Sequence, residues 1–183
     1  MLKSREFAHK AHSDQLYGER PYMFHVDGVA QIIIDLLSEH KYFPVLLDAA
    51  YLHDVPEDTQ FKLPVISAVF GLSRSQPVGL LTDEDGENRK ERKQKTYAKF
   101  RNEPVLMIRQ IAATVKYADR FFNIHQSYQE WLLSSGEAQK RGLRKLKMYA
   151  GEHVEFKLVY GGYILSSELR DKLDSLVKEI NER

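Results

Sequence analysis

Apolar residues recur at helical spacing through almost the whole chain, and this pattern constrains the fold more than any other feature. Between Val29 and Leu37 they follow one another at intervals of three and four residues, which places them on one face of an α-helix. The same spacing runs from Val105 to Ile124 and from Leu165 to Ile180. No alternating apolar and polar segment is long enough to predict a sheet. The sequence therefore predicts an all-α fold.

Prolines and glycines divide this pattern into separate helices. Pro44 is placed to begin a helix that continues to Leu52, since proline is favoured at the first helical position. A short helix starts near Leu63 and stops at Gly71, a residue type that commonly follows helix ends. Pro77 predicts a break before the next apolar stretch. The polar segment 83–89 predicts a loop before a basic helix.

The length of 183 residues predicts one compact domain. We expect residues 1–160 to form its body and residues 161–183 to add a C-terminal amphipathic helix that packs on it. No apolar run has the length of a membrane span, and the charged N-terminus lacks an apolar signal region. The chain contains no cysteine, which excludes disulfides, thiolate zinc sites and cysteine nucleophiles. These features predict a cytoplasmic protein.

The stretch from His53 to Asp58 carries the strongest chemical signal. It contains one imidazole and three carboxylates, with no basic side chain among them. Such a cluster is electrostatically costly unless a cation lies between its members or some are protonated. His25 and Asp119 offer further nitrogen and oxygen ligands of the kind that divalent transition metals bind. The pattern favours metal-assisted hydrolysis, and its structural alternative is an acidic turn that caps a helix.

The net charge of +1 conceals a separation of charge along the chain. Residues 86–101 hold seven basic and two acidic side chains, and residues 137–147 hold five and one. This separation suggests a metal site on one wall of a pocket and an anion-binding site on another. Solvated helix faces are the alternative. Nucleic-acid binding is not favoured, because the total charge is near neutral and aromatic residues are not interleaved with the basic ones.

Three motifs resemble those of a known family. The segments Pro21–His25 (PYxxH), His53–Asp58 (HDxxED) and Lys116–Asn123 (KxADRxxN) are similar to those of HD-domain metal-dependent phosphohydrolases of the RelA/SpoT hydrolase type. The likeness includes the small stand-alone alarmone hydrolases of that family and covers residues 5–130. It implies that the all-α fold is an HD-domain helical bundle.

The resemblance also implies roles for individual residues. One divalent ion, with Mn²⁺ favoured, would be bound by the motif histidines and two aspartates: His25, His53, Asp54 and Asp119. Glu57 and Asp58 would activate the attacking water, and Asn123 would contact the substrate. The neighbouring cations could neutralise phosphates: Arg89, Lys90, Arg92, Lys93 and Lys116. A solvated lysine remains the alternative for Lys116.

The implied activity is that of a guanosine-3′,5′-bis(diphosphate) 3′-pyrophosphohydrolase, in which a metal-bound water attacks the phosphate. A nucleotidase or phosphatase that acts on another phosphoester would use the same site. A nucleotide-binding regulator without activity is a third hypothesis, although the intact ligands and the Glu57–Asp58 pair oppose it. The expected partner is a nucleotide or alarmone, with no membrane, and a homo-oligomer stays open.

Several residues depart from the family pattern or lie outside its motifs. The basic residue that holds guanine in the family is missing near Gln15, so base specificity is not predicted. Arg74 and Pro77 occupy positions that are usually apolar and helical. His9 and His12, which belong to none of the three motifs, are predicted to form a surface pair.

Core packing is predicted for three further residues. Tyr149 and Glu152 fall where the small subgroup has a similar motif and could close the pocket, but core packing is the favoured interpretation. Trp131 is predicted to be a core residue.

Overall fold

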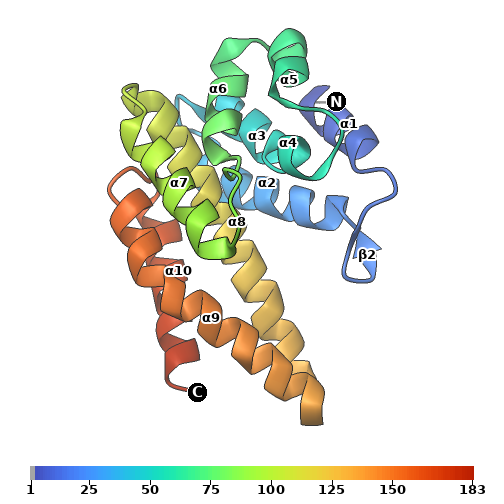
Figure 1. The fold of residues 1–183 in the computed structure, drawn as a ribbon, viewed down its shortest axis with the longest axis vertical. Coiled ribbons are helices and arrows are strands. Elements are labelled where there is room, and N and C mark those ends of the chain that lie inside the picture. The colour runs from blue at the N-terminus through green and yellow to red at the C-terminus, as the bar shows by residue number, and fades with distance from the viewer. Residues whose placement is uncertain (1–2) are drawn as a thin grey trace.

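The two longest helices of the described chain, α8 and α9, follow one another in its C-terminal half, as Figure 1 shows. The structure is a computed structural model that describes residues 3–183. The first two residues of the predicted domain and of its charged N-terminus lie outside the described residues. The elements, in chain order, are α1 Lys3–Ala11, β1 Leu16–Tyr17, β2 Arg20–Pro21, α2 Met23–Leu37, α3 Phe43–Leu52, α4 Val55–Asp58, α5 Leu63–Phe70, α6 Leu72–Leu81, α7 Arg89–Asn102, α8 Leu106–Leu133, α9 Gly136–Tyr160 and α10 Ser167–Asn181.

The core lies where α2, α3 and α6 pack on α8. The apolar stripe read from the sequence is the buried face of α2, where Val29 and Ile33 are fully buried. Leu46 on α3 and Ile111 on α8 complete the contact and are also fully buried. The predicted all-α fold in a single compact domain is therefore confirmed. The apolar residues at helical spacing form the helix faces that pack together.

A glycine allows α2 and α8 to approach closely. A Cβ atom at Gly28 would lie 2.0 Å from Cε2 of Phe122, a distance that no side chain tolerates. Phe122 is itself buried and packs edge-on against Phe24 and His25. Gly28 therefore permits the ring of Phe122 to lie directly on the backbone of α2.

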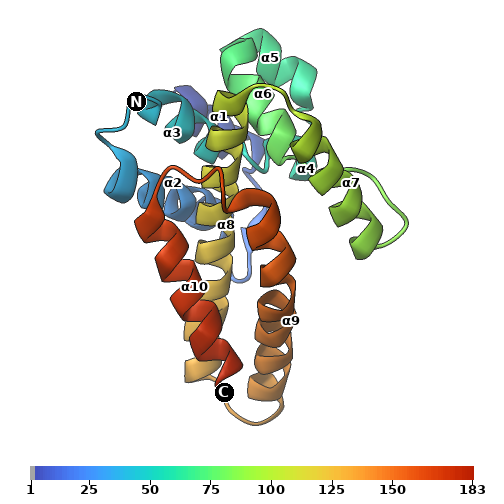
Figure 2. The ribbon, with the colours of Figure 1, turned by 90° about the vertical axis from the view of Figure 1, so that its left-hand side faces the viewer.

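The last two helices pack on the long helix α8. Figure 2 shows α9 and α10 running alongside the lower part of α8, whose upper part reaches the N-terminal helices, and each of the three contacts the other two. The amphipathic pattern of residues 165–180 is borne out in α10, which buries Leu169, Leu173 and Ile180. The long run predicted to end at Ile124 continues as α8 to Leu133, and Trp131 near its end is only partly buried.

The predicted break at Pro77 is wrong. Pro77 lies inside α6 and is buried together with Val78, Leu80 and Leu81. A proline in a helix interior removes one hydrogen bond and costs about 3 kcal/mol. Burial of three apolar neighbours against the core offsets that cost, at roughly 1.5–3 kcal/mol for each fully buried side chain. Arg74 in the same helix pairs with Asp48, with Nε 2.5 Å from Oδ2, which explains a charged residue at that position.

A very short hairpin interrupts the helices. Strands β1 and β2 pair antiparallel, with Leu16 opposite Pro21 and Tyr17 opposite Arg20. Gly18 between them has φ +62°, a left-handed conformation that glycine adopts without strain. The pair has too little extent to change the fold class, but it places Tyr17 beside α2.

Within residues 3–183, no helix combines the length and the apolar character that crossing a membrane requires.

Candidate active site

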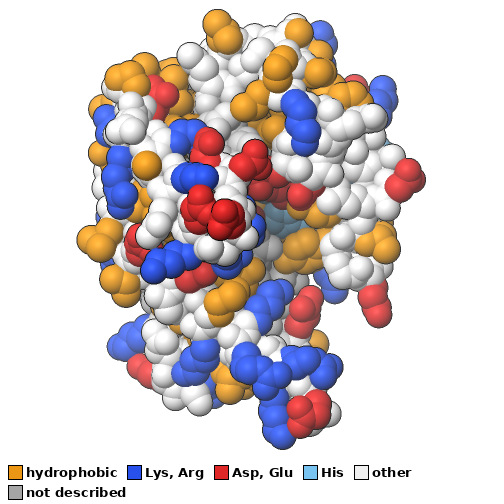
Figure 3. All heavy atoms as spheres, viewed as in Figure 1, with side chains coloured by type: hydrophobic (Ala, Val, Ile, Leu, Met, Phe, Trp, Pro, Cys, Tyr) orange, Lys and Arg blue, Asp and Glu red, His pale blue; other side chains and the backbone are white. Residues whose placement is uncertain are grey.

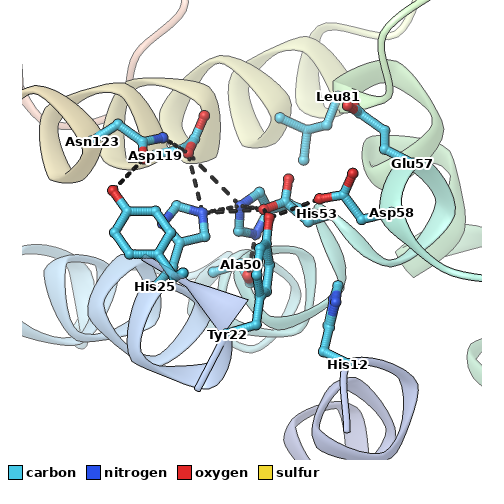
Figure 4. Close-up of polar contacts among 12 residues, drawn as sticks. His12, Tyr22, His25, Ala50, His53, Glu57, Asp58, Leu81, Asp119 and Asn123 are labelled. Carbon is cyan, nitrogen blue, oxygen red and sulfur yellow. Dashed lines mark hydrogen bonds and ion pairs between the residues drawn. The ribbon is translucent and has the colours of Figure 1, made fainter. Parts of the chain in front are cut away.

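The four predicted metal ligands converge from three separate parts of the fold. His25 lies in the first turn of α2, His53 follows the last residue of α3, Asp54 precedes α4, and Asp119 lies in the middle of α8. Figure 4 shows the side chains of His25, His53 and Asp119 pointing toward one another. The Nε2 atoms of His25 and His53 are 3.1 Å apart. Oδ2 of Asp54 lies 3.1 Å from the first nitrogen and 3.0 Å from the second.

These spacings fit a bound divalent ion. Ligands held at about 2.1 Å from a metal and at right angles to each other lie about 3.0 Å apart. Oδ1 of Asp119 lies 3.4 Å from Nε2 of His25 and 3.9 Å from Nε2 of His53, which places it on the same cluster. Nδ1 of His53 donates to the carbonyl of Ala50 at 2.7 Å, so its Nε2 is left to bind a metal. His25, His53 and Asp54 can therefore hold one ion together.

The charges in this cluster also favour a cation. Burial lowers the pKa of His53, but the carboxylates of Asp54 and Asp119 outweigh that effect and raise it to about 9. Burial opposes ionisation of Asp54, yet the two imidazoles hold its pKa well below the ordinary value. Positive charge is thus stabilised between these groups, whether it is a proton or a metal ion.

Tyr22 holds two of the carboxylates in place. Its hydroxyl lies 2.8 Å from Oδ2 of Asp54 and 2.7 Å from Oδ2 of Asp58. Its ring stacks on His12, with the centroids 4.6 Å apart. The predicted surface pair is therefore wrong for His12, which is 3% exposed and supports Tyr22, whereas His9 is exposed. Helical spacing predicted that both histidines share one face. It did not show that His12, which follows the last residue of α1, is buried against Tyr22.

Asn123 orients Asp119 in the same way. Its Nδ2 donates to Oδ1 of Asp119 at 2.6 Å, and its Oδ1 accepts a hydrogen bond from the hydroxyl of Tyr17 at 2.8 Å. Asn123 also lines the cavity, so a contact with substrate stays a prediction. Tyr17 stacks on His25 with the rings 5.1 Å apart, and the hairpin thereby closes one side of the metal cluster.

Glu57 lies at the junction between the metal cluster and the basic residues. One of its carboxylate oxygens accepts the backbone N–H of Asp83 at 2.7 Å. Burial raises the pKa of Glu57 above the ordinary glutamate value, although Lys116 acts in the opposite direction. A raised pKa suits a carboxylate that accepts a proton near neutral pH. Pro56 precedes it in the first turn of α4, where the missing N–H of proline costs no hydrogen bond.

Lys116 is held in the cavity and is not a solvated lysine. Its Nζ donates to the carbonyl of Leu81 at 2.9 Å and lies 3.4 Å from a carboxylate oxygen of Asp83. Burial disfavours its charge, but Asp83 and Glu57 outweigh burial and raise its pKa. A permanent positive charge therefore stands beside Glu57.

One cavity connects the metal cluster with a basic wall. It is lined at one end by His25, Asp54 and Asp119, and at the other by cations of α7 and α8. Figure 3 shows a hollow with a histidine at its base and acidic side chains at its edge. The residues that line the basic wall are Arg89, Lys93, Lys116 and Arg120. Lys90 and Arg92 are exposed and do not line the cavity, because they lie on other faces of α7.

Two residues assigned to packing belong to this wall. Tyr149 lines the cavity. Glu152 forms ion pairs with Arg89, with Lys93 and, at 3.9 Å, with Arg120. The interpretation of Glu152 as a core residue is wrong, because α9 turns its side chain toward α7, whereas Tyr149 lines the cavity and also packs against the core.

The site contains some residues for which the sequence analysis predicted no role. Tyr22 stands three residues before His25 and Arg120 directly follows Asp119, so each is within one helical turn of a ligand. Their position in the same motifs as the ligands could have indicated a role in the site. Tyr17 and Asp83 had no comparable signal, because the loops that carry them reach the site only in the folded chain.

A helical bundle in which two histidines and two aspartates converge has the ligands that a divalent metal ion requires. No family model matches the chain, and no curated protein matches it in sequence. The chain is similar to a solved structure of a metazoan ortholog of SpoT, which hydrolyzes ppGpp and plays a role in starvation responses. The match covers 97% of this chain and 93% of the SpoT ortholog. The TM-score is 0.69 and the identity 22%. The chain therefore has the HD-domain helical fold of that protein, as the motifs predicted.

Proposed function

We propose that the chain is a metal-dependent phosphohydrolase that acts on guanosine tetra- or pentaphosphate and releases pyrophosphate from the 3′ position. The observation that carries this proposal is the meeting of a four-ligand cluster and a wall of cations in one cavity. The similar fold of the metazoan SpoT ortholog, which hydrolyzes ppGpp, supports it. Pyrophosphate is an anion that a basic wall stabilises.

The ligand set favours one ion with the preferences of Mn²⁺. Two imidazoles and two carboxylates mix nitrogen and oxygen donors, which suits manganese better than calcium or magnesium. When bound, such an ion makes water more acidic and polarises a phosphoryl oxygen.

The chain's own residues would carry the remaining steps. Glu57 would orient a water molecule and accept its proton, which its raised pKa supports, and Asp58 would share this role, since Tyr22 links it to Asp54. Lys116, Lys93 and Arg89 would neutralise the phosphates.

The rival function is hydrolysis of another nucleotide or phosphoester. One observation favours it: among the described residues that line the cavity, the hairpin contributes Tyr17 and no basic side chain. Gln15 hydrogen-bonds to His12, and Arg20 lies over the ring of Phe24. The third hypothesis, an inactive regulator, is opposed by the converged ligands and by the position of Glu57.

A release assay on purified protein with Mn²⁺ tests these functions. We expect pyrophosphate release from guanosine tetraphosphate, and a loss of about 10³-fold or more in Asp54→Ala, since a catalytic metal contributes several kcal/mol. Glu168→Gln, in an exposed pair with Lys172, is the matched control and should retain full activity. Orthophosphate release from simple nucleotides would support the rival. Tight binding without turnover would support the regulator.

We also infer that residues 161–183 belong to the same domain as residues 1–160, since α10 packs on α8 and α9. The cytoplasmic location and a homo-oligomer stay predictions.

A further inference from the structure

A single carboxylate stands among three cations at the basic end of the cavity. Arg89 contacts Glu152 in a two-pronged pair, with Nε and Nη2 at 2.9 and 3.1 Å from its two oxygens. Lys93 contacts one of the same oxygens, and Nη1 of Arg120 lies 3.9 Å from it. Within residues 3–183, Glu152 is the one carboxylate in ion-pair range of these three side chains.

Glu152 lies on the face of α9 that borders the cavity. Tyr149 precedes it by three residues and Phe156 follows it by four, and both line the cavity. Residues at these spacings share one side of a helix. The side chain of Glu152 is 23% exposed, so it is partly open to solvent.

Arg120 is fixed in this arrangement independently of Glu152. Its side chain is 9% exposed, Nη2 donates to the carbonyl of Tyr149 at 2.7 Å, and the guanidinium lies 4.5 Å from the ring centroid of Phe156. Its buried Nε has no hydrogen-bond partner in the described part of the chain. A cation held by other contacts and aimed at this site would still face it if Glu152 moved away.

The local charges are not balanced. Three positive groups surround one negative group, which leaves an excess of two positive charges in a partly desolvated place. Burial lowers the pKa of Lys93, which reflects the cost of keeping that charge. Glu152 is ionised at neutral pH, because Arg89 and Lys93 hold its pKa at about 2 even though burial opposes ionisation. The cluster therefore has the capacity for more negative charge than Glu152 supplies.

We propose that Arg89, Lys93 and Arg120 form a phosphate subsite and that Glu152 is its resident anion, which an incoming phosphate group must displace. This inference rests on the proposed function and adds a specificity-determining residue to it. The carboxylate carries one negative charge. A group with a single charge, such as a phosphodiester, therefore gains nothing by replacing it, whereas a terminal phosphate or pyrophosphate with two or more charges does. Glu152 would select substrates that present such a terminal group.

The test measures binding of inorganic pyrophosphate by titration calorimetry on the full chain in the presence of a chelator. Under these conditions neither the metal nor turnover contributes, so the result is independent of whether the chain hydrolyses any nucleotide. We expect Glu152→Gln to bind pyrophosphate about tenfold more tightly than the unmodified chain, since the competing charge is removed. Formate, with one charge, should bind detectably only to the variant. Glu168→Gln should behave as the unmodified chain.

Two further variants complete the design. Arg89→Gln and the double variant Arg89→Gln/Glu152→Gln should both bind pyrophosphate more weakly than Glu152→Gln, which places the binding at this cluster. A folded Glu152→Gln with unchanged or weaker pyrophosphate binding overturns the proposal and makes Glu152 a structural clamp. If that variant does not fold, Glu152→Asp decides. Its carboxylate is one methylene shorter and holds the cations less well, so pyrophosphate must bind more tightly for the proposal to stand.

Discussion

At one end of the cavity the polar side chains are short and buried, whereas at the other they are long and partly exposed. His25 and His53 are 2% and 4% exposed, and neighbouring groups orient their partners Asp54 and Asp119. Arg89 is 50% exposed, and it is held by the carboxylate of Glu152. The first end is arranged before any ligand arrives, and the second exchanges one ion pair for another.

This difference suggests that the metal end determines the rate of the reaction and that the basic end determines which ligand binds. A metal cluster requires fixed distances, which short side chains with few rotatable bonds provide at a small entropic cost. Long cations reach phosphates of varied position but lose rotamer freedom when they are held. We expect substitutions at the first end to change the rate and substitutions at the second to change which ligand binds.

The largest effect after loss of a metal ligand is expected at the junction of the two ends. Glu57→Gln should lower the rate about 10²–10⁴-fold, the usual contribution of a general base. Because the base must be deprotonated, the raised pKa of Glu57 predicts that activity falls on acidification at a pH above the ordinary 4.5. A pH–rate profile measures both effects. Glu84→Gln, which removes a pair with Lys99, is the control, and an unchanged rate in Glu57→Gln would contradict the role of Glu57.

A smaller effect is expected where the metal end is held by its neighbours. Tyr22→Phe removes the hydroxyl that contacts Asp54 and Asp58. Loss of such a supporting hydrogen bond typically costs about 10–100-fold in metal affinity or activity. Mn²⁺ titration of the variant measures this effect. Tyr42→Phe, at a tyrosine that packs on His40 outside the cavity lining, should leave the affinity unchanged. Equal effects of the two changes would mean that the metal end is not preorganised.

Two neighbouring lysines test the basic end. Lys93 lines the cavity and Lys90 does not, although both lie in the same basic segment. Lys93→Ala should raise KM for the polyphosphate substrate about tenfold, the equivalent of one charge-assisted hydrogen bond. Lys90→Ala should change it little. If the two variants have the same KM, the basic segment acts through its overall field and not through contact.

The smallest effect concerns stability in acid. The pKa of Glu152 lies at about 2 in the folded chain against an ordinary value of 4.5. Its ionisation therefore stabilises the fold above pH 4.5, and this contribution is lost as the pH falls toward 2. We expect about 1 kcal/mol, because partial exposure screens the ion pairs. Urea unfolding between these pH values should show a shallower decline for Glu152→Gln than for the unmodified chain. Parallel declines would show that the ion pairs contribute no stability.

The metal ligands and three cations of the basic wall could be predicted from the sequence, but Arg120 and the ion pairs of Glu152 could not. His53 and Asp54 are adjacent, and His25 and Asp119 lie in helical stretches whose apolar faces indicate how they pack. Two partners of Glu152 are 59 and 63 residues away in α7, and Arg120 is 32 residues away in α8, so only the folded chain brings them together. The same limit applies to Tyr17 and Asn123, which are separated by 106 residues.

The remaining errors have a common physical origin. Pro77 and His12 were assigned from local preferences, which describe an isolated segment. In the folded chain Pro77 is buried within α6 and His12 is buried against Tyr22. Tertiary packing overrides local preference when the buried surface is large enough, and the sequence does not show how much surface a neighbour will cover.

The contact between Gly28 and Phe122 has a consequence for how proteins of this kind are identified. His25 precedes Gly28 by three residues, and Asp119 precedes Phe122 by three, so this contact lies within one helical turn of both ligands. An alanine at position 28 would keep every ligand, every charge and every motif, yet its methyl group would overlap the ring of Phe122, so that the ring or the helices would have to move. A chain with a complete set of ligands can thus be unable to gather them. A search for such proteins should therefore ask for a residue without a side chain at position 28 as well as for the ligands themselves.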